Sequence, residues 1–189
     1  LKILKIMRLL ITLITLSLLA HIAPAQYCTP VGNCVFDDNI DDFQFNTISN
    51  LNSGGSNCGS RFAPRNAYSN TGIRTTVTQG QKYYMRVASN AIANREQGFG
   101  IWIDFNNDND FEDLGEFVWN SAGADSAFTD SILIPFSSST GLTRMRVRSQ
   151  RNATINSTQS CSTINRGETE DYLIDIQAAR RYYSQSSHL

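Results

Sequence analysis

Histidine is nearly absent from this 189-residue sequence, which contains only His21 and His188. A serine or cysteine nucleophile usually requires a histidine base, and the metalloprotease motif HExxH requires two histidines on one helix. The cysteines also lack the CxxC spacing that is typical of structural zinc sites. The sequence therefore argues against a histidine-dependent hydrolase, an HExxH metalloprotease and a zinc domain.

The sequence also has no excess of basic or acidic residues, since it contains 16 basic and 17 acidic residues. Proteins that bind nucleic acid usually show a clear basic excess. We therefore expect no nucleic-acid partner.

The N-terminus differs from the rest of the chain. Three basic residues within the first eight precede an apolar run over residues 9–20, and the small residues Ala23-Pro24-Ala25 follow. This pattern predicts a secretory signal peptide over residues 1–25, cleaved before Gln26. The alternative, a membrane anchor, is disfavoured because a span needs about 20 apolar residues. Cleavage would remove three basic residues and leave 13 basic against 17 acidic residues, a net charge of −4. We expect a secreted or cell-surface protein without a membrane span after cleavage.

All four cysteines follow this segment, and an even number in an exported chain predicts two disulfides. The four are Cys28, Cys34, Cys58 and Cys161. Three pairings are open. The close spacing of Cys28 and Cys34 would suit a small loop, which would leave Cys58 to pair with Cys161.

Short segments with period-2 alternation recur along the chain, separated by turn residues, and no helical stripe accompanies them. Within one of them, Ile101 and Ile103 alternate with Trp102. The pattern predicts an all-β fold over residues 26–177, an antiparallel β-sandwich of jelly-roll or immunoglobulin-like kind. Residues 178–189 are expected to form a disordered tail or linker. The predicted strands cover residues 40–45, as an edge strand, and 73–78, 82–88, 100–105, 116–119, 131–136, 143–149 and 172–176.

An acidic loop over residues 104–116 contains six carboxylates and no basic residue. Oxygen donors at alternate positions of a tight loop can converge on a hard cation such as Ca²⁺, which takes six to eight oxygens. The sixth position, which usually has a positive φ, is Asn109, and asparagine tolerates that conformation. The candidate ligands are Asp104, Asn106, Asp108, Asp110, Glu112 and Glu116.

The twelfth position of this loop is Gly115, which has no carboxylate, and Glu116 comes one residue late. Other acids could therefore complete the shell. The additional candidates are Asp113, Glu168, Glu170 and Asp171. A polar turn without a metal is the alternative interpretation, since Asn and Asp favour turns by themselves. Repulsion among the six carboxylates favours a cation.

Four segments resemble the GEVED domain family: residues 101–111, 115–117, 143–148 and 167–172. The last contains the Gly-Glu-Val-Glu-Asp signature as Gly167-Glu168-Thr169-Glu170-Asp171, with Thr169 in place of valine. In the acidic loop, Asn109 replaces the usual glycine. The resemblance covers nearly all of residues 27–176. It implies an extracellular accessory module of Bacteroidetes and related bacteria, which often accompanies secreted proteases or adhesins.

These observations favour a non-catalytic, calcium-binding module that assists adhesion or an extracellular enzyme and binds carbohydrate or a cell-surface protein. Trp102 and Trp119 are candidate ligand-stacking aromatics, although such residues more often belong to a core. The arginines of residues 144–148 are expected to form ion pairs across strands. Two alternatives stay open: a self-assembling adhesin subunit of unknown oligomeric state, and a glycan-acting hydrolase. The hydrolase would draw its carboxylate pair from Glu112, Glu116, Glu168 and Glu170.

Overall fold

The computed structural model describes residues 26–34, 38–54, 65–90 and 96–180. The predicted signal peptide, Cys58 and the end of the tail lie outside these residues. Within the described ranges, no helix has the length and apolar character needed to cross a membrane. The elements are β1 (Gly32–Cys34), β2 (Asp42–Phe45), β3 (Ile48–Asn50), β4 (Arg65–Asn66), β5 (Tyr68–Thr78), β6 (Lys82–Ala88), β7 (Gln97–Ile103), β8 (Phe117–Asn120), β9 (Ala127–Leu133), β10 (Gly141–Arg151), the 3₁₀ turn η1 (Ser157–Gln159), β11 (Ile164–Asn165) and β12 (Thr169–Gln177).

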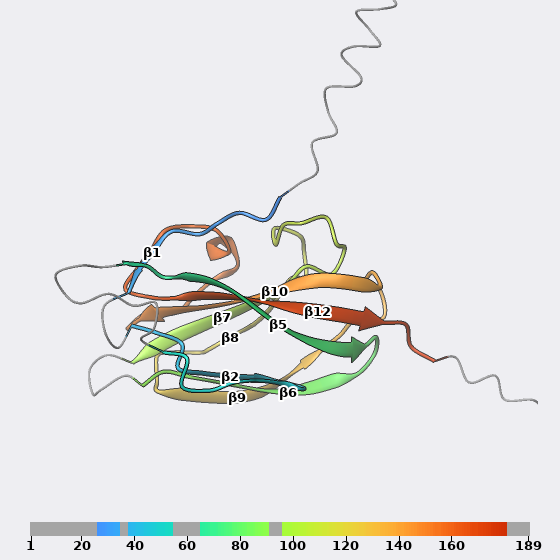
Figure 1. Ribbon diagram of the computed structural model, residues 1–189, viewed down its shortest axis with the longest axis horizontal. Coiled ribbons are helices and arrows are strands. Elements are labelled where there is room, and N and C mark those ends of the chain that lie inside the picture. The colour runs from blue at the N-terminus through green and yellow to red at the C-terminus, as the bar shows by residue number, and fades with distance from the viewer. Residues whose placement is uncertain (1–25, 35–37, 55–64, 91–95, 181–189) are drawn as a thin grey trace, which may run out of the picture.

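Two sheets face each other as the layers of a sandwich (Figure 1). One has the strand order β5-β12-β10-β7-β8 and the other β3-β2-β6-β9. Their neighbouring strands are antiparallel, except that β12 and β5 run parallel. The predicted all-β sandwich is therefore confirmed, with one parallel pair. The prediction that residues 40–45 form an edge strand is wrong, because β2 pairs with β3 on one side and β6 on the other.

The main core fills the space between the two sheets. Alternation along β10 and β12 directs Met145, Val147, Tyr172 and Ile174 inward, where each is fully buried. Phe43 packs against Tyr172 with ring centroids 4.9 Å apart. Inward residues of both sheets thus meet across the sandwich, as the period of two predicts.

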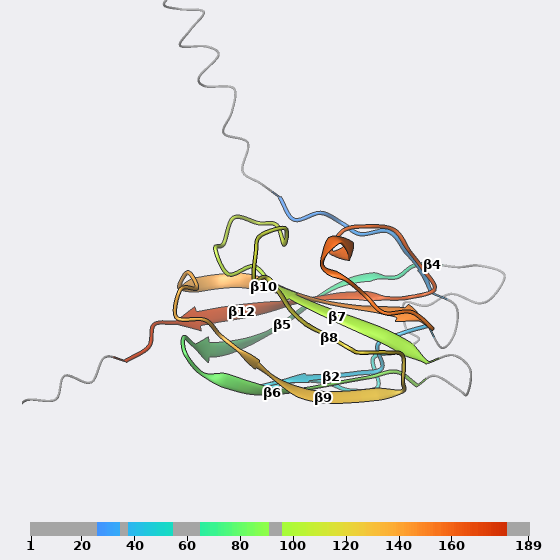
Figure 2. The same ribbon diagram turned by 180° about the vertical axis from the view of Figure 1, so that it is seen from behind.

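The outer face of the five-stranded sheet is covered as well. The N-terminal segment and the segment that contains η1 lie over it (Figures 1 and 2). They are joined by a small sheet of order β11-β1-β4. A second apolar cluster of Trp102, Phe111, Ile155 and Ile164 lies under this cover. Every residue of β7 is consequently buried, with Ile101 and Ile103 in the main core and Trp102 in the outer cluster.

Candidate functional site

The acidic loop connects β7 to β8 on the covered side of the five-stranded sheet (Figure 1). Asp104 begins the loop and is completely buried. Its backbone N donates to the Arg144 carbonyl at 3.1 Å, and its own carbonyl accepts from the Thr143 hydroxyl at 2.8 Å. At the other end, Ile103 N donates to the Glu116 carbonyl at 2.9 Å. The loop is therefore closed at its base and anchored to β10.

Side-chain oxygens organise the interior of the loop. The Asp104 carboxylate accepts from Asn107 N at 2.5 Å and from Asn109 N at 3.1 Å, and it accepts from the Tyr27 hydroxyl at 2.5 Å. Asn107 and Asn109 have φ values of 63° and 74°. Asparagine tolerates this left-handed region. The positive φ predicted at the sixth position is thus present at Asn109, although the residue is not glycine.

Three carboxylates of the loop converge. Asp108, Asp110 and Asp113 each place an oxygen within 4.8 Å of the others. The Asn106 amide joins them, since its Nδ2 donates to Asp108 at 2.8 Å and to Asp113 at 2.7 Å. If that amide were rotated by 180°, its oxygen would replace its NH₂ group beside the carboxylates and could bind a cation together with them. These four side chains form the acidic cluster, an all-oxygen donor set suited to a hard cation.

The predicted ligands do not all meet in the acidic cluster. Asp113, expected only as an additional ligand, belongs to it, whereas the Asp104 oxygens accept from two backbone N–H groups and from the Tyr27 hydroxyl. Glu112 is exposed and contributes its N–H to Asp110 at 2.8 Å. Turn bonds of this kind arise between neighbours in the chain, and the alternate-position rule does not distinguish them from ligands.

Glu116 lies at the floor of the loop with 2% of its surface exposed. Its Oε1 accepts from Phe105 N at 2.8 Å and from Asn106 N at 3.4 Å. Among the described residues, its buried Oε2 has no hydrogen-bond partner. Burial raises the pKa of Glu116 to about 7, and the charges of Asp104 and Asp108 add to the rise, while the two backbone bonds oppose it. No basic group is among the causes of the shift, so the Glu116 carboxyl lacks a nearby positive charge among the described residues.

The motif of residues 167–171 is divided between the two faces of its strand. Glu168 and Glu170 face inward, with 2% and 3% of their surfaces exposed. Glu168 accepts from Ile40 N at 2.9 Å, and Glu170 accepts from the Tyr172 hydroxyl at 2.5 Å. Burial raises their pKa values to about 8 and about 7. These two glutamates do not complete the cation shell, because they lie between the sheets and their partners are Ile40, Asn50, Ser53 and Tyr172.

Residues 98–175 match the family model of the GEVED domain. The resemblance to the GEVED domain is confirmed over these residues. The match includes both the acidic loop and the residue 167–171 motif, and it runs from β7 to within β12. The match begins at residue 98, whereas the resemblance noted in the sequence covers residues 27–176. The strands β2, β3, β5 and β6 precede residue 98 and belong to the same sandwich. No curated protein matches the chain.

The other face of the GEVED motif holds the ion pairs that the sequence predicts. Asp171 is completely buried and accepts from Arg146 through Nε and Nη2, each at 2.8 Å. Arg144 donates to the same carboxylate at 3.1 Å. Arg148 donates through Nε to the Thr169 hydroxyl at 2.9 Å. Valine, the usual residue of the signature at this position, has no hydroxyl that could accept this bond. Asp171 is thus an anchor for arginines and is not available to the acidic cluster.

Arg146 also holds the outer cover. Its guanidinium donates to the carbonyls of Cys28 at 2.9 Å and Ser160 at 3.0 Å, and it lies 4.8 Å from the Phe111 ring centroid. The GEVED motif is therefore connected through Arg146 to the N-terminal segment, to the η1 segment and to the acidic loop.

Of the three pairings that the sequence leaves open, the one that joins Cys28 to Cys34 in a small loop is not formed. Cys28 forms a disulfide with Cys161, across 133 residues of sequence, with Cα atoms 6.1 Å apart. Cys34 is buried and is also disulfide-bonded. The long-range bond arises because the N-terminal segment crosses the η1 segment on the outer face, which spacing along the chain does not reveal.

The candidate aromatic platform is not formed. Trp102 is fully buried in the outer cluster, so it cannot stack on a ligand. Trp119 is partly buried against the main core, and its indole N–H donates to Asp130 at 2.8 Å. Both tryptophans therefore pack in or against a core, as aromatic side chains of strands usually do.

Proposed function

We propose that this GEVED domain is a non-catalytic, calcium-binding β-sandwich module of an exported protein, accessory to adhesion or to an extracellular enzyme. The observation that carries the proposal is the convergence of Asp108, Asp110 and Asp113 within 4.8 Å, next to the Asn106 amide. Three carboxylates so close repel one another unless a cation or protons intervene. Ca²⁺ accepts such oxygen-only, irregular donor sets more readily than Mg²⁺ does.

The buried Glu116 supports the same proposal. Its partnerless Oε2 and its raised pKa show a carboxyl that lacks a positive partner among the described residues. A divalent cation in the loop would supply that charge and would favour the ionised form. The cation would hold together a loop whose base is anchored to β10, so its expected role is to stabilise the loop.

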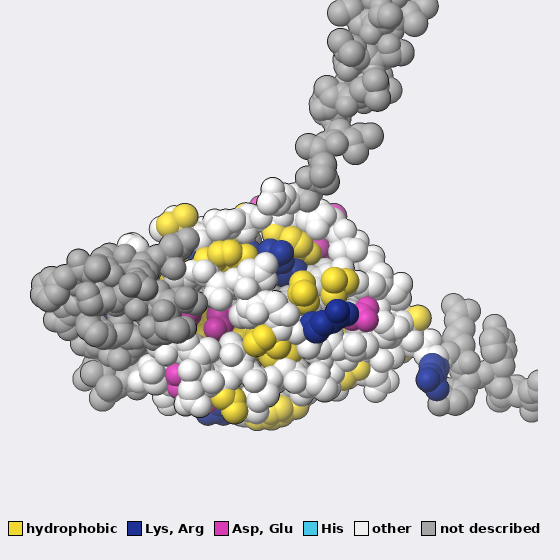
Figure 3. Space-filling view, in the orientation of Figure 1, with side chains coloured by type: hydrophobic (Ala, Val, Ile, Leu, Met, Phe, Trp, Pro, Cys, Tyr) yellow, Lys and Arg dark blue, Asp and Glu magenta, His cyan; other side chains and the backbone are white. Residues whose placement is uncertain are grey.

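Export is supported by the predicted signal peptide and by the Cys28–Cys161 disulfide, which suits an oxidising compartment. The face shown in Figure 3 displays hydrophobic side chains scattered among polar groups, without one extended charged patch. This surface suits a soluble recognition module better than a nucleic-acid binder.

A non-catalytic role is supported by the positions of the glutamates that a glycan hydrolase would use. Glu168 and Glu170 lie between the sheets and are almost completely buried, and Glu116 is buried at the floor of the loop. A glycosidase requires two carboxyl groups that flank the same glycosidic bond. Of the four candidates, only Glu112 is exposed to a substrate.

Titration calorimetry with CaCl₂ tests the cation proposal on the purified protein. We expect saturable binding that weakens by roughly tenfold or more in Asp108→Asn and Asp113→Asn, because each loses a charged ligand. The control is Asp175→Asn, which removes one carboxylate from β12 outside the loop. Equal affinity in all four proteins, or no binding by the wild type, would refute the proposal.

A further inference from the structure

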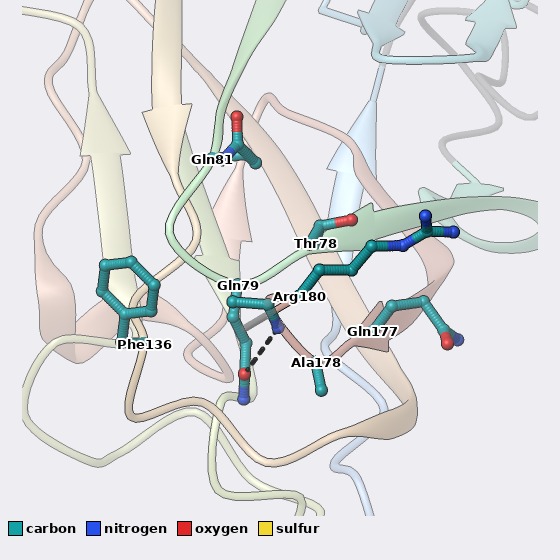
Figure 4. A pocket seen from close by; sticks show the side chains of 8 residues that line it. Thr78, Gln79, Gln81, Phe136, Gln177, Ala178 and Arg180 are labelled. Atoms are coloured by element: carbon teal, nitrogen blue, oxygen red, sulfur yellow. Dashed lines mark hydrogen bonds between the residues drawn. The ribbon is translucent and has the colours of Figure 1, made fainter. Parts of the chain in front are cut away.

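A cavity of about 670 Å³ opens at the end of the sandwich that is remote from the GEVED motif. Three segments form it: the turn between β5 and β6, the loop that follows β9, and the end of β12 (Figure 4). Its size lies within the range of small-molecule sites, roughly 300–1,000 Å³. The cavity shares no residue with the acidic cluster.

Gln79 ties the three segments together at the floor of the cavity. Its backbone N donates to the Gln177 carbonyl at 3.0 Å, and its Nε2 donates to the Ser138 carbonyl at 2.6 Å. Its Oε1 accepts from Ala179 N at 3.2 Å, the bond that Figure 4 marks. The shape of the cavity is therefore fixed by hydrogen bonds before any ligand enters.

An exposed aromatic ring forms one wall. Phe136 keeps 74% of its surface exposed, yet the far end of its ring is seated over Gly80. A Cβ added at Gly80 would lie 2.2 Å from Phe136 Cζ, so only glycine allows this contact. The far end of the ring thus contacts Gly80 while most of its surface remains open, as stacking against an apolar face of a ligand requires.

Polar side chains without partners complete the wall. Among the described residues, the side chains of Gln81, Gln177 and Arg180 form no hydrogen bond or ion pair, and all three line the cavity. Each glutamine amide offers both donors and an acceptor. None of the described residues that line the cavity carries a carboxylate. The available groups therefore suit a ligand rich in hydroxyl groups.

We propose that this cavity is a carbohydrate-binding site, in which a sugar ring stacks on Phe136 and its hydroxyl groups bond to Gln81, Gln177 and Arg180. A sugar presents an apolar C–H face beside neighbouring hydroxyls, which matches one open ring next to free amides. An apolar peptide anchor would leave these amides unpaired, which is unfavourable. This inference rests on the proposed function as an accessory module and names the class of ligand that the module binds. It does not require the cation.

The loop of the cavity also contacts the acidic loop. Ser139 N donates to the Phe105 carbonyl at 2.6 Å, and the Ser139 hydroxyl donates to the Asn106 carbonyl at 3.1 Å. Binding of sugar must therefore be measured both in calcium and in EDTA. If binding persists in EDTA, the cavity is the ligand site independently of the cation. If calcium titration fails while sugar binding succeeds, only the cation proposal is lost.

The test uses affinity electrophoresis and calorimetry of the purified protein with β-1,4-glucan, β-1,4-xylan, chitin and polygalacturonate oligosaccharides. We expect at least one oligosaccharide to bind, and Phe136→Ala and the double variant Gln81→Ala/Gln177→Ala to weaken its binding by roughly tenfold or more. Leu142→Ala is the matched control, because it removes a hydrophobic side chain that is 48% exposed and lies outside the cavity. Melting temperatures show whether each variant remains folded.

Two results would overturn the proposal: no oligosaccharide binds the wild type in either buffer, or binding is unchanged in Phe136→Ala and in the glutamine double variant.

Discussion

At the scale of single residues, a fully buried ion pair joins Arg146 to Asp171. Both side chains are fully buried, and two bonds of 2.8 Å join them. A buried carboxylate that loses its partner carries a large desolvation penalty. The pair therefore specifies where β12 lies beside β10 and where the outer cover is attached.

We predict that Arg146→Ala lowers the free energy of unfolding by about 3–5 kcal/mol, because Asp171 would remain buried without its main partner. Chemical denaturation measures the change. The control is Arg86→Ala, which breaks the Arg86–Asp42 pair at 2.6 Å, whose side chains are 32% and 21% exposed; ion pairs in contact with solvent contribute about 0–1 kcal/mol. Equal losses in the two variants would contradict this account of the GEVED motif.

The inward glutamates of the motif predict a pH dependence of stability. Burial first, and then the Glu170 and Asp41 charges, raise the pKa of Glu168 from its ordinary 4.5 to about 8. Burial raises that of Glu170 to about 7. Above about pH 4.5 the unfolded chain has lost these protons, whereas the folded protein keeps the proton of Glu170 up to about pH 7 and that of Glu168 up to about pH 8. The free energy of unfolding should thus fall as pH rises through this window, by up to roughly 1.4 kcal/mol per pH unit for each proton.

Denaturation in EDTA across this pH range measures the slope. The double variant Glu168→Gln/Glu170→Gln should make the slope shallower, because glutamine resembles the protonated acid and does not titrate; the part that remains comes from Glu116, whose pKa is also raised to about 7. Asp175→Asn should leave the slope in place. A wild-type slope that the double glutamine variant retains would show that other groups produce it.

Period-2 alternation makes part of this residue-scale account predictable from the sequence. It places Glu168 and Glu170 on one face of the strand, and Thr169 and Asp171 on the other. Which face meets the arginines depends on the register of β10 against β12, where Arg146 lies opposite Asp171. That register is set by the whole sheet, so sequence alone leaves both glutamates as candidate ligands.

At the scale of elements, the start of β12 depends on the close approach of two backbones. A Cβ at Gly167, the first residue of the GEVED signature, would lie 1.9 Å from the Ser149 carbonyl oxygen of β10. Since that oxygen belongs to the backbone, it cannot move without disturbing the strand.

We predict that Gly167→Ala lowers the free energy of unfolding by about 2 kcal/mol or more, as overpacking of this kind usually does. Thermal and chemical denaturation measure the loss. Gly123→Ala is the control, because nothing lies within 4 Å of a Cβ at Gly123. Alanine tolerated equally at both positions would mean that β10 and β12 are not so close.

Strand prediction succeeds where alternation is long and fails where pairing is brief. The predicted segment 82–88 coincides with β6, since its inward residues Met85 and Val87 reach the core. By contrast, β4 and β11 have two residues each, and β1 has three. A period cannot be recognised over so few residues, so the small sheet of the outer cover is absent from the prediction.

At the scale of the whole molecule, contacts distant in sequence join the candidate site to the fold. Tyr27 reaches Asp104, and Cys28 is bonded to Cys161. In the chain-entropy model, closing a loop this long stabilises the fold by roughly 4–5 kcal/mol. The sequence predicts the acidic loop because its donors are neighbours in the chain. It does not predict the Cys28–Cys161 disulfide or the complete burial of Trp102, because both depend on the segments that cover the outer face of the five-stranded sheet.

Above all, we propose that the acidic cluster binds calcium in the folded protein. The most direct test is the melting temperature of the oxidised wild type, measured by calorimetry in EDTA and then across a calcium titration. At 100 times the dissociation constant, a ligand specific to the folded state adds about 2.7 kcal/mol, which should raise the midpoint by roughly 5–10 °C for a domain of this size. A saturable rise is the predicted result. A midpoint that stays constant from EDTA to saturating calcium would contradict the claim and leave the loop as a polar turn.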